Sequence, residues 1–279
     1  MTTGKMNRTE FDSRPIGIFD SGLGGLTVAA QIIRTLPSES IVYLGDTARV
    51  PYGNRSRETL IRYAREDAAF LRSRNVKMIL AACNTVSATA LEQLKAEIVD
   101  VPVCGVIEAG VVAASAEKIR SILVIGTRAT IASGAYQNKL KEMNPELQIF
   151  DVACPLLVPL AEEGIVSGEI VKQVFDLYLK RFKIDPPDAV LLGCTHYPLF
   201  KNALNEYFSY QVKIIDSAAS CAEYIRDNLN SNILFPAPEN NVPDHHYFAT
   251  DLTKEFRRVA ANFMGSSNPP DITKISLQE

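Results

Sequence analysis

The chain has 279 residues, of which 47% are hydrophobic and 22% are charged, and its formal net charge at pH 7 is −3. This composition is ordinary for a globular protein with a hydrophobic core, and the length allows one large domain or two smaller ones. The nearly balanced charge provides no basic surface, which argues against nucleic acid as the main partner.

Targeting and redox signals predict a protein of the reducing cytoplasm. The first ten residues are polar and lack the apolar centre of a signal peptide. No uninterrupted apolar run approaches the ~18 residues of a membrane span. The five cysteines are odd in number and irregularly spaced, which does not fit a disulfide framework. We therefore expect a cytoplasmic protein that does not contact a membrane.

After a disordered lead expected over residues 1–14, the first half predicts alternating strands and helices, which is typical of βαβ units in a parallel sheet. Expected strands cover 16–19, 41–44, 77–82 and 101–105, and expected helices cover 26–36, 56–74 and 84 to about 95. The helix over 56–74 is charged and amphipathic. Its apolar residues at helical spacing are Leu60, Ile61, Ala64, Ala68 and Leu71.

The pattern then restarts, so the second half is predicted to repeat the first. Expected strands cover 122–125, 148–152, 189–192 and 212–215, with helices over 131–143, up to about 183, and after 198. Asp20 precedes Cys83 by nearly as many residues as Thr127 precedes Cys194. We therefore predict an α/β protein of two similar, doubly wound parallel-sheet domains facing each other. The first comprises residues 15–105 plus 212–279, and the second comprises residues 106–211.

The tail departs from this pattern. Pro236, Pro238 and Pro243 interrupt it, and a strand over 247–250 and a helix over 252–263 are predicted to follow, with a loop at 265–270. The helix has Phe256, Val259, Ala260 and Phe263 on one face. This tail is too apolar to remain free, so we expect it to dock on the first domain.

Two predicted strands end in similar polar motifs, each opening with a cysteine. Cys83 begins the sequence Cys-Asn-Thr, and Cys194 begins Cys-Thr-His. Open α/β sheets bind ligands at the carboxyl ends of their strands, so we expect both thiols to line one cleft. The remaining cysteines are interpreted as core residues: Cys104, Cys154 and Cys221.

Two thiols in one cleft are compatible with several kinds of chemistry. A zinc site would need further ligands, and the chain has only three histidines. A redox pair would favour Cys-x-x-Cys, which is absent, and a cysteine hydrolase leaves the second thiol without a role. General acid–base catalysis uses both thiols. One thiolate removes a proton from carbon while the other thiol donates a proton to the opposite face, which inverts a stereocentre.

A glycine-rich turn, Asp20-Ser-Gly-Leu-Gly-Gly25, follows the first predicted strand. It is not a dinucleotide fingerprint, because Thr27 occupies the third glycine position, and it lacks the Gly-Lys-[Ser/Thr] of a phosphate loop. One interpretation is a turn that needs glycine for positive φ. The other is a set of backbone amides at a helix N-terminus that hold a carboxylate, with Asp20 holding an ammonium group or tuning Cys83.

Four motifs together resemble those of one family. They are Asp20-Ser-Gly-Leu-Gly-Gly25, Pro51-Tyr-Gly53, Cys83-Asn-Thr85 and Gly193-Cys-Thr-His-Tyr-Pro198. In this order and spacing they are similar to the motifs of bacterial glutamate racemases, within the cofactor-independent aspartate/glutamate racemase superfamily. The resemblance covers about residues 15–228 and extends to the tail over 247–265.

The resemblance implies two α/β domains related by a pseudo-twofold axis, with glutamate bound between them and no pyridoxal phosphate, metal or nucleotide. Cys83 and Cys194 match the two catalytic cysteines, the first acting as base toward the D-enantiomer and the second toward the L-enantiomer. Asp20 and His196 match residues that assist them, and all the following match substrate contacts or neighbours of the site: Asp20, Ser21, Tyr52, Gly53, Asn84, Thr85, Thr127, Thr130, Glu162, Thr195 and His196. The implied role is the supply of D-glutamate for peptidoglycan.

Elementary chemistry agrees with this resemblance. An enzyme without an electron-sink cofactor must stabilise a carbanion electrostatically, and amide and hydroxyl donors in a closed, dry cleft suit that task. Three alternatives remain: an aspartate racemase or other enzyme on the same scaffold, a pyridoxal-dependent racemase, and a two-lobed binding protein without catalysis. A homodimer is expected only from the general frequency of dimers.

Overall fold

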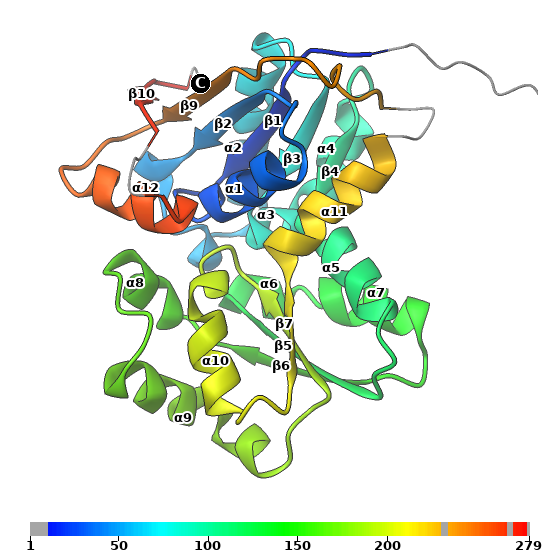
Figure 1. The fold of residues 1–279 in the computed structure, drawn as a ribbon, viewed down its shortest axis with the longest axis vertical. Helices are drawn as coiled ribbons and strands as arrows, with labels where there is room; N and C mark the ends of the chain where they lie inside the picture. Colours follow the sequence, from blue (N-terminus) through cyan, green and yellow to red (C-terminus); the bar gives the residue numbers. More distant parts are fainter. Residues whose placement is uncertain (1–10, 230–233, 267–269, 278–279) are drawn as a thin grey trace, which may run out of the picture.

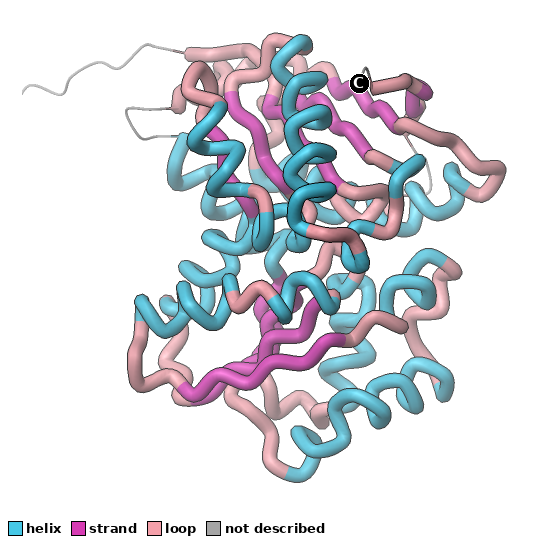
Figure 2. Tube along the Cα trace, turned by 180° about the vertical axis from the view of Figure 1, so that it is seen from behind, coloured by secondary structure: helices cyan, strands magenta, loops and turns pink. Residues whose placement is uncertain are grey.

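The computed structural model describes residues 11–229, 234–266 and 270–277. Two separate parallel sheets form the centre of the molecule, one above the other in Figure 1, and helices cover their faces. Seen from behind, the long helix α2 (Arg57–Ser73) crosses the outer face of the upper sheet (Figure 2). The predicted fold, an α/β protein with two similar parallel sheets, is confirmed.

The first sheet has the strand order β10-β9-β2-β1-β3-β4, and every pair in it is parallel. Its strands are β1 (Ile16–Asp20), β2 (Ile41–Gly45), β3 (Met78–Ala81), β4 (Val103–Gly105), β9 (His245–Ala249) and β10 (Ile272–Lys274). Helices α1 (Leu26–Thr35), α11 (Ser217–Leu229) and α12 (Phe256–Met264) cover one face, whereas α2, α3 (Asn84–Thr89) and α4 (Leu91–Glu97) cover the other.

The second sheet has the order β6-β5-β7-β8 and is also wholly parallel. Its strands are β5 (Ser121–Gly126), β6 (Gln148–Ala153), β7 (Ala189–Gly193) and β8 (Lys213–Asp216). Helices α5 (Val106–Ser115) and α7 (Ala135–Met143) pack on one face, and α8 (Leu157–Glu162), α9 (Glu169–Ile184) and α10 (Lys201–Tyr207) pack on the other. The short helix α6 (Arg128–Ala132) follows β5.

The two sheets share one topology. Within each, the four strands that come first in the chain lie in the order second, first, third, fourth. β1 and β7 are buried at every residue. Their continuous apolar runs predicted this burial, because such runs are typical of parallel strands that are covered on both faces. In β1, Ile16 and Ile18 pack toward α1, while Phe19 packs toward α2. The predicted internal repeat is therefore present in the tertiary structure.

Several predicted boundaries need correction. Strand β8 was expected in the first domain, but it pairs with β7, so the second sheet continues to Asp216; the division into two domains remains a proposal. The helix predicted over 131–143 is divided into α6 and α7 by Gly134, whose φ of 67° is costly for other residues. Helices α5 and α11 and strand β10 were not predicted.

The chain ends also differ from expectation. Residues 1–10 of the predicted disordered lead, and residues 267–269 of the predicted loop at 265–270, lie outside the described ranges. Residues 11–14 are ordered, because the Asp12 amide donates a hydrogen bond to the Pro236 carbonyl at 3.1 Å. At the other end, β9 extends the first sheet beside β2.

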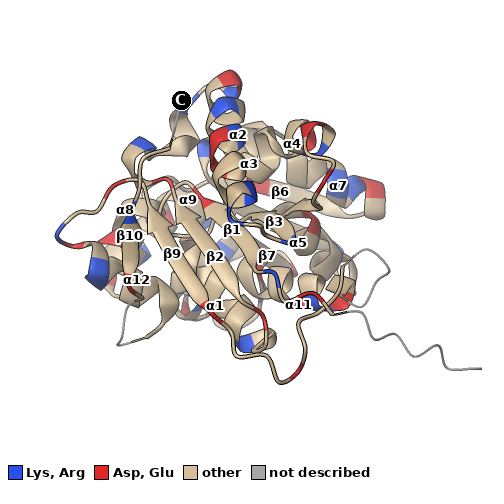
Figure 3. Ribbon diagram, turned by 90° about the horizontal axis from the view of Figure 1, so that it is seen from above, with Lys and Arg blue, Asp and Glu red and all other residues tan. Residues whose placement is uncertain are grey.

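The ribbon in Figure 3 shows no concentration of one charge in any part of the described chain. Basic and acidic residues are interspersed on helices and loops, whereas the central strands carry few of them. Within the described ranges, no helix is long and apolar enough to cross a membrane.

A buried ion pair connects the residue before β3 to the segments around Asp12, Glu39 and Phe235. The Lys77 side chain is 1% exposed, and its Nζ lies 2.5 Å from Glu39 Oε2. Lys77 also donates hydrogen bonds to the carbonyls of Asp12 and Phe235, both at 3.0 Å. Glu39 in turn accepts from the Ala237 amide at 2.8 Å.

Lys77→Met is therefore expected to lower the free energy of unfolding by about 3 kcal/mol, because it leaves the Glu39 carboxylate buried without its cation. Urea denaturation followed by circular dichroism measures this loss. As a control, Lys213→Met removes an exposed ion pair with Glu117 and should cost less than about 1 kcal/mol. Equal losses in the two variants would contradict the prediction.

Candidate active site

A cavity of about 260 Å³ lies between the two sheets, where residues that follow β1, β3, β5 and β7 meet. Carboxyl ends of parallel strands are the usual place for ligands in open α/β sheets. Eleven of the thirteen residues expected near a site line this cavity: Ser21, Tyr52, Gly53, Cys83, Asn84, Thr85, Thr127, Glu162, Cys194, Thr195 and His196. The other two, Asp20 and Thr130, are fully buried beside it.

Cys83 occupies the N-cap position of α3, directly after β3. It is 5% exposed, and its sulfur lies 3.6 Å from the Ser21 hydroxyl. Burial raises the pKa of Cys83 to about 12, and the nearby Asp20 carboxylate adds to this rise. Cys83 is therefore a neutral thiol near pH 7, suited to donating a proton.

Cys194 follows β7 and is the first residue of a hydrogen-bonded chain that continues through His196 to Glu162, which we call the Cys194 relay. Its sulfur lies 3.8 Å from His196 Nδ1, and His196 Nε2 lies 3.1 Å from Glu162 Oε1. Burial lowers the pKa of His196, but the hydrogen bonds to Cys194 and Glu162 outweigh burial and raise this pKa to about 10. The imidazole is therefore protonated near pH 7, and both ring nitrogens can donate hydrogen bonds.

Asp20 lies behind the cavity wall rather than in it. Its Oδ2 accepts a hydrogen bond from the Gly22 amide at 3.0 Å. Burial raises the pKa of Asp20, while the positive charge of His196 opposes the rise. Because Asp20 does not line the cavity, it can influence Cys83 and His196 electrostatically, whereas the predicted contact with an ammonium group would require it to become exposed.

Hydroxyl and amide groups join the two sheets across the cavity. The Thr85 hydroxyl, on α3, lies 3.0 Å from that of Thr127, which caps α6 and lies 3.0 Å from the Thr130 hydroxyl. The Tyr136 hydroxyl donates to Asn84 Oδ1 at 2.7 Å. Asn84 Nδ2 is buried without a hydrogen-bond partner among the described residues, so it is a donor available to a ligand.

Close packing requires a glycine at position 24 of the turn after β1. A Cβ atom at Gly24 would lie 2.3 Å from Thr195 Oγ1 and 2.6 Å from the His196 ring. The turn's glycines do not adopt positive φ, so that interpretation of the turn was wrong. The alternative, amides that hold a carboxylate, remains a prediction.

Tyr52 and Gly53 form a wall of the cavity from the first sheet's side. Tyr52 is only 2% exposed, and its hydroxyl points away from the cavity toward Asp46 and Asp67. Gly53 approaches Thr127 so closely that a Cβ atom there would lie 3.3 Å from the Thr127 Cβ. Tyr52 therefore lines the cavity without offering its hydroxyl to a ligand in this arrangement.

Sequence reasoning missed other lining residues: Gly22, Val50, Pro51, Asn54, Arg128, Pro155, Val158 and Pro159. Arg128 could have been identified, because it lies between the predicted site residues Thr127 and Thr130. It contributes the only guanidinium among the described residues that line this cavity. The apolar residues from the start of α8 carry no comparable signal. Among the described residues, no group of three or more His, Cys, Asp or Glu could hold a metal ion.

Comparison with known proteins finds similarity over almost the whole chain. The family model "Asp/Glu/Hydantoin racemase" matches residues 16–225. The glutamate racemase of Geobacter metallireducens is 44% identical over 266 residues, covering 95% of this chain and 97% of that protein. The glutamate racemase of Aquifex aeolicus is 47% identical over 259 residues, covering 92% and 97%. The crystal structure of Francisella tularensis glutamate racemase with D-glutamate has a TM-score of 0.87 at 37% identity, covering 96% of this chain and 99% of that one.

The charge of His196 provides a direct test of the relay. Glu162→Gln should lower the pKa of His196 from its value of about 10, because the variant loses the negative charge that stabilises the imidazolium. NMR titration of the imidazole signals measures this shift, and the chain has only three histidines to assign. Glu163→Gln is the matched control, since it removes the same charge one residue away. If the pKa of His196 were unchanged in Glu162→Gln, Glu162 would not stabilise the imidazolium, and the Cys194 relay would be contradicted.

Proposed function

The chain belongs to the Asp/Glu/hydantoin racemase family, and on this basis we propose that it is a glutamate racemase that interconverts L- and D-glutamate. Support for glutamate comes from the names of relatives that are 44% and 47% identical over most of their length. Further support comes from D-glutamate in the similar Francisella tularensis structure.

One observation carries the proposal. Cys83 and Cys194 come from equivalent third strands of two sheets with the same topology, and both line one cavity. A racemase needs an acid and a base on opposite faces of the reacting carbon, and two similar cysteine motifs that line one cavity offer such a pair. A binding protein would have no use for paired thiols.

The proposed reaction starts with L-glutamate between the two sulfurs. The Cys194 thiolate, beside the His196 imidazolium, takes the α-proton and becomes a thiol, which leaves a planar carbanion. Cys83, as a thiol, then donates its proton to the opposite face of that carbon and becomes a thiolate. The product is D-glutamate. Cys194 then loses its proton to solvent and Cys83 gains one, which restores the starting thiolate and thiol. The reverse reaction uses Cys83 as the base.

The cavity offers neutral donors for the developing negative charge. Asn84 Nδ2 has no partner among the described residues, and the hydroxyls of Ser21, Thr85 and Thr127 also line the cavity. Donors fixed before the reaction stabilise an enolate-like carboxylate without reorganisation. Arg128 is exposed at this lining and is placed to attract a dicarboxylate substrate.

The wider role follows from the same family. We propose that the D-glutamate supplies peptidoglycan synthesis in the cytoplasm of a bacterium. The homodimer expected from general frequency remains a prediction.

The wild-type reaction is tested by proton NMR of L-glutamate, and then D-glutamate, in D2O with no added cofactor. We expect loss of the α-proton signal and decay of optical rotation to zero from either enantiomer. Exchange with aspartate but not with glutamate would change the proposed substrate. No exchange with either amino acid would contradict the proposed activity.

Single-cysteine variants test the two thiols separately. Cys83→Ala retains the base for L-glutamate, so it should exchange the α-proton of L-glutamate for deuterium without racemisation, and leave D-glutamate unchanged. Cys194→Ala should show the opposite preference. Cys104→Ala, outside the cavity lining, is the control and should racemise normally. Wild-type racemisation rates in either active-site variant would exclude the mechanism.

A further inference from the structure

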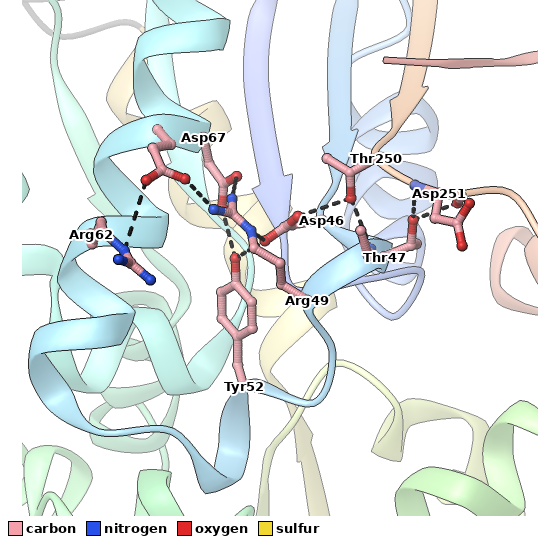
Figure 4. Close-up of polar contacts among 10 residues, drawn as sticks. Asp46, Thr47, Arg49, Tyr52, Arg62, Asp67, Thr250 and Asp251 are labelled. Carbon is pink, nitrogen blue, oxygen red and sulfur yellow. Dashed lines mark hydrogen bonds and ion pairs between the residues drawn. The ribbon is translucent and has the colours of Figure 1, made fainter. Parts of the chain in front are cut away.

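One wall of the cavity is held by a polar cluster behind it. Residues 50–54, which include the 3-10 helix η2 (Tyr52–Asn54), form this wall. Tyr52 lines the cavity, but its hydroxyl enters a group that we call the Asp46 cluster (Figure 4). This cluster comprises Asp46, Arg49, Tyr52, Glu66, Asp67 and Thr250.

Asp46 is the centre of the cluster and is completely buried. Its Oδ2 accepts hydrogen bonds from the Tyr52 hydroxyl and from Arg49 Nε, the latter at 2.5 Å. Its Oδ1 accepts a hydrogen bond from the Thr250 hydroxyl at 2.9 Å. A single carboxylate therefore joins the cavity wall to the end of β2 and to the C-terminal segment.

Helix α2 supplies the outer side of the cluster. Asp67 is also completely buried, with Oδ1 3.2 Å from Arg49 Nη2 and Oδ2 3.2 Å from the Tyr52 hydroxyl. Arg49 pairs with Glu66 as well. Burial raises the pKa of Asp67 well above its ordinary value, and the Asp46 carboxylate raises it further.

The C-terminal segment closes the cluster from the side of β9. The Thr250 hydroxyl accepts a hydrogen bond from the Ala48 amide at 2.9 Å. The Thr47 hydroxyl donates to the Asp251 carbonyl at 2.5 Å and accepts from the Asp251 amide at 2.8 Å. Thr250 lies beyond residues 16–225, the part that the family model matches. The C-terminal segment is therefore hydrogen-bonded to residues 47 and 48, which lead into the cavity wall.

We propose that the Asp46 cluster positions Tyr52 and Gly53 against Thr127, and that Thr250 makes this wall of the substrate cavity depend on the C-terminal segment. The inference rests on the proposed function, since it assigns Tyr52, Asp46 and Thr250 as positioning residues for glutamate. Its physical basis is that residues 46–54 contain only the short 3-10 helices η1 (Thr47–Arg49) and η2. Buried, mutually hydrogen-bonded side chains fix such a segment more strictly than its own backbone does.

Two pairs of variants test the proposal. Thr250→Val removes the hydroxyl but keeps the shape, whereas Thr250→Ser keeps the hydroxyl. Tyr52→Phe removes only the hydroxyl that Asp46 accepts. Its control is Tyr63→Phe, because the Tyr63 ring packs 5.4 Å from the Tyr52 ring while its hydroxyl takes no part in the cluster's hydrogen bonds.

We expect kcat/KM for glutamate to fall about tenfold or more in Thr250→Val and Tyr52→Phe, with a raised KM, because small misplacements of a binding wall are costly. Thr250→Ser and Tyr63→Phe should remain within about twofold of the wild type. Thermal unfolding of each variant is measured in parallel. Wild-type kcat and KM in Thr250→Val and Tyr52→Phe, with only a lower Tm, would overturn the positioning role and leave a structural one.

A second measurement separates failure of this proposal from failure of the proposed function. If the wild type does not racemise glutamate, alkylation of Cys83 by iodoacetamide is followed by mass spectrometry. A displaced wall should expose Cys83, so the alkylation rate should rise several-fold in Thr250→Val and Tyr52→Phe but not in the two controls. Equal rates in all variants would overturn the proposal, whatever the substrate is.

Discussion

The site depends on the close approach of the two sheets at the carboxyl ends of their strands. At the tightest point, Gly24 of the first sheet's turn lies against Thr195 and His196, where even a methyl group would overlap. The Thr27 hydroxyl strengthens this contact by donating to the Thr195 carbonyl at 3.0 Å. Because the two halves meet here, Cys83 and Cys194 line the same cavity.

Burial at this junction controls the protonation of the groups around the cavity. Burial and the nearby Asp20 carboxylate raise the pKa of Cys83 to about 12, although the Val86 amide and the Ser21 hydroxyl oppose the rise. His196 is equally buried but has partners on both ring nitrogens, and its pKa rises to about 10. Two similar motifs thus acquire different electrostatic environments, as expected where an acid and a base must differ in their protonation before the reaction.

Buried polar groups with close partners are also present behind the cavity wall. Two buried carboxyl groups, Asp46 and Asp67, share one arginine, and the Tyr52 hydroxyl lies between them. Buried polar groups are tolerated when their hydrogen bonds are satisfied, and they then restrict the arrangement of the surrounding chain. The cavity wall, α2 and the C-terminal segment are therefore held as one unit.

Much of the site was accessible from the sequence, because local motifs carry it. Apolar runs that end in Cys-Asn-Thr and Cys-Thr-His predicted both strands and the thiols that follow them. The buried stripe of α2 was also predicted, but Asp67 was overlooked although it occupies that stripe between Ala64 and Leu71. An acidic residue at a buried position is a signal of a polar cluster, and periodicity of apolar residues alone does not reveal it.

The sequence by itself determined the α/β class, the repeat, and the identity of the paired cysteines, since these depend on short-range patterns. Only the tertiary structure decided that β8 joins the second sheet, that Asp20 and Thr130 lie outside the cavity, and that Thr250 contacts Asp46. These features depend on contacts between residues far apart in the chain. Strand pairing and the burial of a charge result from packing of the whole fold, so no local pattern specifies them.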